Sequence, residues 1–131
     1  MADASSGNFG CQRCWPVSPD DAWEARAGLS HQATLIDESH LIASVLGCPV
    51  CSQRFVSVFI ETVDWVGGDD PQCWVQLPLT PDEAERLTRE PVTEADLHGL
   101  GGGRRSLLKG FLRGGVEKCM WTKGLSIGWH D

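Results

Sequence analysis

The sequence is short of several features that would assign it to a familiar class. It has 131 residues with no tyrosine and two methionines, but it has six tryptophans, which can supply much of the core of a chain this short. No apolar run approaches the roughly 18–20 residues that span a bilayer, so we expect no membrane contact. The first residues carry neither a basic nor an apolar segment, and this start predicts no secretory signal. We therefore expect a cytoplasmic protein.

Catalytic motifs are also missing. The sequence has no Gly-x-Ser-x-Gly, no His-Glu-x-x-His and no cysteine next to an evident base. The glycine-rich residues 99–103 lack the preceding strand and the Gly-Lys-Ser/Thr ending of a phosphate-binding loop. We predict no catalytic residues, and a metal-dependent enzyme remains a further alternative.

Charge is distributed unevenly. The net charge is −7, with 5 basic and 16 acidic side chains in residues 1–97 and 6 basic and 2 acidic side chains in residues 98–131. Nucleic-acid binding needs cations that displace phosphate counterions, so the acidic part argues against it. The basic segment is expected either to pack on the acidic part or to meet an acidic partner, and we expect that partner to be a protein. The sequence gives no oligomeric state.

Four of the six cysteines form two C-x-x-C pairs, Cys11–Cys14 and Cys48–Cys51. Two thiolates three residues apart can turn inward on a tight loop, and two such loops complete a tetrahedral zinc shell. Free cysteines at this spacing in a chain without a signal favour metal binding over disulfides. We predict Cys11, Cys14, Cys48 and Cys51 as the metal ligands.

The knuckle Cys48-Pro49-Val50-Cys51, followed by an apolar strand, resembles the zinc-ribbon and rubredoxin-like families. The resemblance covers Cys48 to about Phe55 and, more loosely, the chain to Leu79. It departs where those families usually place glycine after the second cysteine, because this chain has Ser52. The resemblance implies a knuckle on a β-hairpin that holds zinc, or iron as the alternative.

Two histidines offer an alternative shell with Cys48 and Cys51. If residues 33–46 form a hairpin, His31 lies close to the knuckle. His40 is then at the far end of the hairpin, about 8 residues from the knuckle at a rise of about 3.3 Å per residue, and is out of reach of the metal. If the segment is helical or looped, both histidines can bind the metal. The shell is therefore either all cysteine or a mixture of histidine and cysteine.

Strands are expected in the middle of the chain. Residues 55–66 are apolar at both odd-numbered and even-numbered positions, which predicts a strand that is covered on both faces. A turn over 67–71 is expected to lead to a second strand at 72–79. Residues 33–46 fit another hairpin, but a helix from residue 39 is the alternative. The apolar run is too short for its hydrophobic periodicity to distinguish a strand from a helix. Further strand fragments are expected at 116–121 and 125–129.

Helices are expected where capping residues precede acidic turns. Ser18 and Pro19 predict a helix over 19–27, and Thr80 with Pro81 and Glu83 predicts a helix to about Arg89. A third short helix is expected from 93, and residues 104–113 fit a short basic amphipathic helix.

These patterns predict a small α+β fold, in which two or three short helices cover a zinc-ribbon-like β-hairpin core. We divide the chain into a flexible tail (1–10), a metal-binding core (11–97) and a Gly-rich linker with a basic C-terminal segment packing on the core (98–131). The predicted function is a non-catalytic, zinc-binding accessory or protein-interaction module with a closed structural site. The alternative is a rubredoxin-like electron-transfer or metal-delivery protein.

Overall fold

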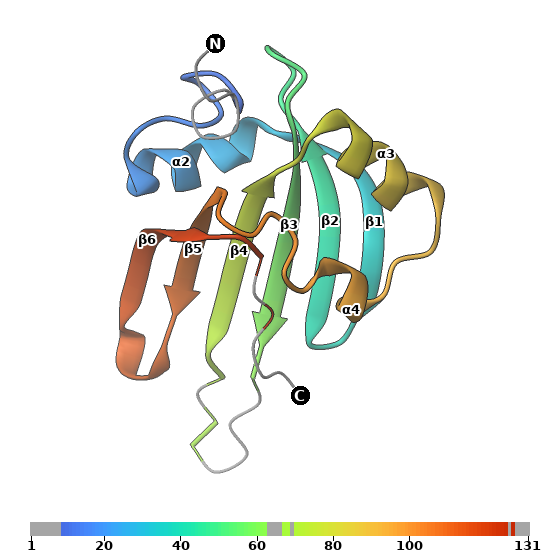
Figure 1. Cartoon of the computed structure of the whole chain (residues 1–131). Helices are drawn as coiled ribbons and strands as arrows, with labels where there is room; N and C mark the ends of the chain where they lie inside the picture. The colour runs from blue at the N-terminus through green and yellow to red at the C-terminus, as the bar shows by residue number, and fades with distance from the viewer. Residues whose placement is uncertain (1–8, 63–66, 69, 126, 128–131) are drawn as a thin grey trace.

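The fold is that of a computed structural model, which describes residues 9–62, 67–68, 70–125 and 127. Its centre is one antiparallel sheet of six strands, in which each strand pairs with the next along the chain (Figure 1). The strands are β1 (Ser30–Glu38), β2 (Leu41–Gly47), β3 (Arg54–Glu61), β4 (Gln72–Pro78), β5 (Arg105–Phe111) and β6 (Glu117–Lys123).

The expected zinc-ribbon-like hairpin core is wrong. The predicted hairpin exists as β3 and β4, but it occupies the middle of the sheet, with β2 paired to β3 and β5 paired to β4. Because β3 and β4 are covered by a neighbour on each edge and by side chains on each face, the core is the whole sheet. Residues 63–66, the end of the expected first strand, lie outside the described residues.

Residues 33–46 form the hairpin of β1 and β2, and the competing helix is absent. Leu41, Ala43 and Val45 are buried, while Ile42 and Ser44 between them are more exposed. This period of two is the alternation of a strand with one face toward the core. The hairpin register therefore follows from which face must be buried.

The basic helix expected over 104–113 is wrong, because residues 105–111 of this segment form β5. Ser106 and Leu107 point to opposite faces of the sheet and both are buried. A helix at the protein surface would bury one stripe only, whereas β5 pairs with β4 on one edge and β6 on the other. The strand expected at 116–121 is confirmed as β6. Of the fragment expected at 125–129, residues 125 and 127 are outside any strand, and 126, 128 and 129 lie outside the described residues.

The helices predicted from capping residues are confirmed. The Ser18 hydroxyl accepts a hydrogen bond from the Asp21 N–H, and Thr80 and Glu83 form a reciprocal capping box. No helix among the described residues is long and apolar enough to cross a membrane. The helical elements are α2 (Pro19–Ala25), η1 (Arg26–Gly28), α3 (Pro81–Arg89), α4 (Glu94–Leu97) and η2 (Arg113–Gly115).

Each face of the sheet carries its own apolar core. α3 and α4 cover one face and α2 lies on the other (Figure 1). The first core lies under α3 and α4 and includes Val58, Leu77, Ala84, Leu87 and Leu97. The second core lies on the α2 side and is formed by Cys14, Trp15, Ala22, Cys48, Phe55 and Leu107. Three of the four paired cysteines, Cys11, Cys14 and Cys48, therefore pack in or against the second core.

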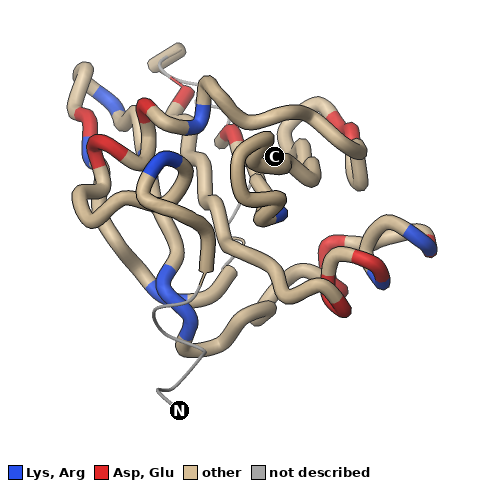
Figure 2. The backbone as a smooth tube through the Cα atoms, turned by 90° about the horizontal axis from the view of Figure 1, so that it is seen from above, with Lys and Arg blue, Asp and Glu red and all other residues tan. Residues whose placement is uncertain are grey.

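Residues 98–123, expected as a linker and a basic segment, contribute two strands to the sheet. Lys and Arg positions lie on several segments of the chain, next to Asp and Glu positions (Figure 2). One such neighbour pair is Arg104, before β5, and Glu83 of α3, whose charged atoms lie 2.7 Å apart. The basic end of the chain is thus joined to the acidic part by specific contacts.

Candidate metal centre

The second cysteine pair lies on the turn between β2 and β3. The Cys48 N–H donates to the Gln53 carbonyl at 2.9 Å, and the Ser52 N–H donates to the Cys48 carbonyl at 2.9 Å. These bonds fold the chain back so that Cys48 and Cys51 face the same side. Ser52 has a φ of 67°, the left-handed conformation that usually belongs to glycine. The knuckle therefore keeps the backbone that the zinc-ribbon resemblance implies, with serine in the glycine position.

The first pair lies on a loop before α2. This loop is closed by a hydrogen bond from the Trp15 N–H to the Cys11 carbonyl at 2.8 Å. Gly10 precedes it with a φ of +72°, and a Cβ at this position would lie 2.7 Å from the Trp15 Cβ and 2.9 Å from the Cys14 Sγ. No other residue type fits here without displacing Cys14 or Trp15.

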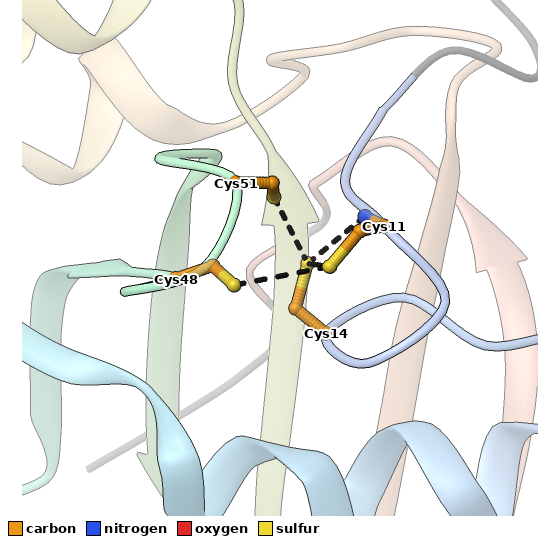
Figure 3. A group of neighbouring side chains, drawn as sticks. All are labelled: Cys11, Cys14, Cys48 and Cys51. Carbon is orange, nitrogen blue, oxygen red and sulfur yellow. Dashed lines mark hydrogen bonds between the residues drawn. The ribbon is translucent and has the colours of Figure 1, made fainter.

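The four cysteines come together although their loops are far apart in sequence. The Sγ–Sγ distances are 3.7 Å for Cys11–Cys14, 4.0 Å for Cys11–Cys48 and 3.7 Å for Cys14–Cys51. All four sulfur atoms lie within 4.8 Å of one another, and their side chains point toward one another from the two loops (Figure 3). They form a group that can hold a metal ion.

These distances fit a tetrahedral metal site. A metal–sulfur bond of about 2.3 Å in a regular tetrahedron separates the sulfurs by about 3.8 Å. Three of the six sulfur–sulfur distances, at 3.7 to 4.0 Å, lie close to this value, and the other three are within 4.8 Å. A disulfide would need about 2.05 Å, so the cluster is one of free thiols.

The four thiols differ in environment. Cys14 and Cys48 are buried, Cys11 is half-buried and Cys51 is exposed. Burial raises the pKa of the Cys14 and Cys51 thiols, whereas a backbone hydrogen bond from within the loop lowers the pKa of Cys11 to about 7. A metal cation reverses the effect of burial, because a coordinating thiol is deprotonated outright.

Backbone N–H groups also point at the sulfurs. The Cys11 N–H donates to the Cys14 Sγ at 3.2 Å, and the Val50 N–H donates to the Cys48 Sγ at 3.4 Å. Each loop therefore directs one backbone donor at a buried sulfur atom.

Gln53 joins the two loops, and the sequence analysis missed it. Its side-chain oxygen accepts from the Gly10 N–H at 3.0 Å, and its amide nitrogen donates to the carbonyls of Arg54 at 2.7 Å and Leu79 at 2.8 Å. One side chain thus ties the first cysteine loop to the ends of β3 and β4. The only local signal was its place two residues after Cys51, which does not separate it from an ordinary turn residue.

Trp15 packs the first cysteine loop against the sheet. Its ring lies 5.2 Å from that of Phe55 on β3 and 4.9 Å from that of Trp121 on β6. Since Trp15 follows Cys14 directly, this packing fixes the direction of the first loop. The cysteine cluster is therefore built against the sheet.

The other candidate residues lie outside the cluster. His31 on β1 bonds to the Thr34 hydroxyl at 3.0 Å, and His40, in the turn between β1 and β2, lies 3.4 Å from a Glu61 carboxylate oxygen. Cys73 is half-buried on β4, and the Cys119 thiol on β6 donates to the Pro19 carbonyl at 3.3 Å. Ligation by the four cysteines or by the histidines stays a prediction.

No protein-family model, no curated protein and no solved structure matches the chain. The resemblance to zinc-ribbon and rubredoxin-like proteins therefore rests on the knuckle residues and on the four-cysteine group. Function has to be argued from the geometry of this chain.

Proposed function

We propose that this protein is a zinc-bearing, non-catalytic interaction module whose metal has a structural role. The observation that carries the proposal is the group of four cysteine sulfurs that lie within 4.8 Å of one another, drawn from two loops 33 residues apart. A zinc ion bound there would join the loop before α2 to the turn between β2 and β3. Cys11, Cys14, Cys48 and Cys51 would hold it.

The donor set supports zinc in a closed site. Four thiolates are typical of structural zinc, whereas catalytic zinc keeps three protein ligands and an open position for water. Zinc supplies charge and a fixed geometry without redox chemistry. Free thiols throughout the chain support a reducing compartment such as the cytoplasm.

A cleft lined by Trp121, whose ring packs on that of Trp15, supports the interaction role. It has a volume of about 900 Å³ and lies between the Gly101–Gly103 turn and β6. Arg105 and Lys123 contribute positive charge and Trp121 contributes an aromatic wall, and none of the described residues that line the cleft is acidic. We propose that an acidic segment of a protein partner binds here.

Crosslinking in cells tests this surface. Wild type and the control Arg89→Glu should both crosslink to a partner, and Lys123→Glu should lose it because the variant reverses a charge in the cleft. Retention of the partner by Lys123→Glu would contradict this surface.

The exposure of Cys51 favours a second candidate function. An exposed ligand can be exchanged, as in a metal-delivery protein, and the same four thiolates suit an iron centre for electron transfer. Metal identity and exchange rate separate these readings, because zinc has no redox cycle and a structural site exchanges slowly.

The deciding experiment is metal content by elemental mass spectrometry on the untagged protein. We expect about one zinc per chain in wild type and its loss in Cys11→Ser and Cys48→Ser. Cys73→Ser is the matched control, because it removes a thiol outside the cluster, and it should keep the metal. His31→Ala should also keep it.

Other results would overturn the proposal in distinct ways. Iron with a visible thiolate absorption band would assign electron transfer. Zinc kept in Cys11→Ser and lost in His31→Ala would assign a mixed shell and reopen an enzyme role. Absence of metal from every sample would refute the metal centre.

A further inference from the structure

Arg26 is a half-buried charged side chain that contacts a hydroxyl and an aromatic ring, since its guanidinium carbon lies 5.4 Å from the centroid of the Trp23 ring. It ends α2, and its Nη2 donates to the Ser57 hydroxyl on β3. Its Nε is buried with no hydrogen-bond partner, and no carboxylate among the described residues pairs with it. A partly buried charge without an opposite charge is unfavourable, and a hydroxyl and an aromatic ring compensate it only in part.

A second buried polar group lies beside it. Gln76 on β4 is directly opposite Ser57, is 2% exposed, and both polar atoms of its amide lack a hydrogen-bond partner. Buried side-chain amides are nearly always paired. This part of the sheet therefore holds more polar groups than the fold's own contacts satisfy.

Arg26 borders a cavity of about 310 Å³ on the α2 side of the sheet. The cavity combines two hydroxyls with an apolar wall. Ser44 and Ser57 are paired on adjacent strands, and the rings of Phe59 and Trp74 lie 4.7 Å apart on the next pair. Its lining consists of Arg26, Ile42, Ser44, Ser57, Phe59 and Trp74, and it includes neither a carboxylate nor a cysteine of the metal centre.

We propose that this cavity binds a small carboxylate with an apolar body of about one ring. The guanidinium fork matches a carboxylate in two parallel hydrogen bonds, and a serine hydroxyl can donate a third. Phe59, Trp74 and Ile42 would contact the apolar body. A volume near the lower end of ligand pockets fits such a molecule and excludes a peptide.

A structural role for Arg26 explains less. A cation at the end of α2 complements the helix dipole, which is worth up to about 1 kcal/mol at an exposed site. That role does not require an Nε shielded from water. Burial also lowers the pKa of the Arg26 guanidinium, which is the sign of a charge without compensation. A bound carboxylate would supply the opposite charge that the guanidinium lacks among the described residues.

The test is binding of benzoate to the full chain, followed by ¹H–¹⁵N NMR. Benzamide has the same shape without the charge, and acetate has the charge without the ring. We expect saturable shifts at Arg26, Ser57 and Trp74 with benzoate, and at least about tenfold weaker binding of both comparison compounds. Benzamide lacks the charge-assisted hydrogen bonds, and acetate has no ring to bury against Phe59 and Trp74. Equal binding of benzamide, or no saturable shift with benzoate, would refute the proposal.

Two variants keep the test independent of folding. Arg26→Met removes the charge but keeps an apolar stem, so we expect benzoate binding to fall at least tenfold and the Tm of the free protein to hold or rise. Arg89→Met is the matched control, because this exposed arginine on α3 pairs with Glu85. It should bind benzoate as wild type does. Unchanged binding by Arg26→Met, or a Tm several degrees lower, would assign Arg26 to the fold and overturn the proposal.

Discussion

At the scale of single residues, Ser52 shows how the knuckle tolerates an unusual residue. Its φ of 67° places a residue with a Cβ in the left-handed region. That conformation is unfavourable by about 1–2 kcal/mol for residues other than glycine, whereas glycine gives up more conformational freedom on folding. The two effects oppose each other in a change from serine to glycine. The backbone strain is the larger effect, so relieving it should raise the stability of the folded protein.

We therefore predict that Ser52→Gly stabilises the protein by about 0.5–1 kcal/mol, equivalent to a rise in Tm of roughly 2–5 °C. Differential scanning calorimetry measures it. Ser52→Val is the opposite control, because a β-branched side chain tolerates this φ least, and it should lower Tm. A lower Tm in Ser52→Gly would show that the serine side chain contributes a contact that outweighs the strain.

At the scale of elements, the capping box of α3 is also the link to β5. Arg104 donates to both Glu83 carboxylate oxygens, at 2.7 and 3.3 Å, and to the Pro78 carbonyl at 2.8 Å. Its guanidinium lies 4.8 Å from the ring centroid of Phe9, just before the first cysteine loop. One ion pair thus joins the helix, the sheet and the N-terminal loop.

This link predicts a pH dependence. Burial alone would raise the pKa of Glu83, but hydrogen bonds from Arg104 and the Thr80 N–H outweigh it and leave the pKa lowered. A lowered pKa in the folded state means that Glu83 stabilises the fold above its ordinary pKa of about 4.3, and that this contribution is lost as pH falls through the folded value. Glu83→Gln should therefore be less stable than wild type at pH 7, and the difference should vanish at low pH.

Urea unfolding of wild type and Glu83→Gln across pH 3 to 7 measures this difference. Glu85→Gln is the control, since Glu85 pairs with Arg89 at 2.9 Å but both side chains are 65% exposed. Exposed pairs contribute little, so its difference from wild type should be small at every pH. A Glu83→Gln difference that is constant with pH would assign the effect to lost packing.

At the scale of the whole molecule, the separation of the two cores limits what a metal can stabilise. The cysteines pack with Trp15, Phe55 and Leu107 on the α2 side, while α3 and α4 cover the opposite face. The strands between them are paired along β1 to β6, and none of the four clustered cysteines lies in a strand. Loss of metal should loosen one face without unfolding the sheet.

We predict that a strong chelator lowers Tm and increases hydrogen exchange in residues 9–29 and 48–53, while β3 and β4 stay protected. A ligand at a thousand times its dissociation constant stabilises the folded state by about 4 kcal/mol, and its removal has the opposite effect. Mass-spectrometric hydrogen exchange with and without chelator resolves the regions. Uniform loss of protection would show that the metal holds the whole fold.

The sequence by itself determined the local features. Ser18, Thr80 and Glu83 mark helix starts because a cap involves residues only three positions apart. The hairpin of β3 and β4 follows from a turn between two apolar runs, and each cysteine pair is visible in its own loop. These interactions are short in sequence, so the residues that make them are found together.

Tertiary structure alone decided how the local pieces meet. The 104–113 segment became a strand because β4 and β6 supplied hydrogen bonds on both edges, and no pattern within the segment contains those partners. The contact between Gly10 and Gln53 spans 43 positions, and the contact between Arg26 and Ser57 spans 31. The metal centre and the cavity both depend on such long-range contacts, because pairing across the sheet sets which distant side chains share a face.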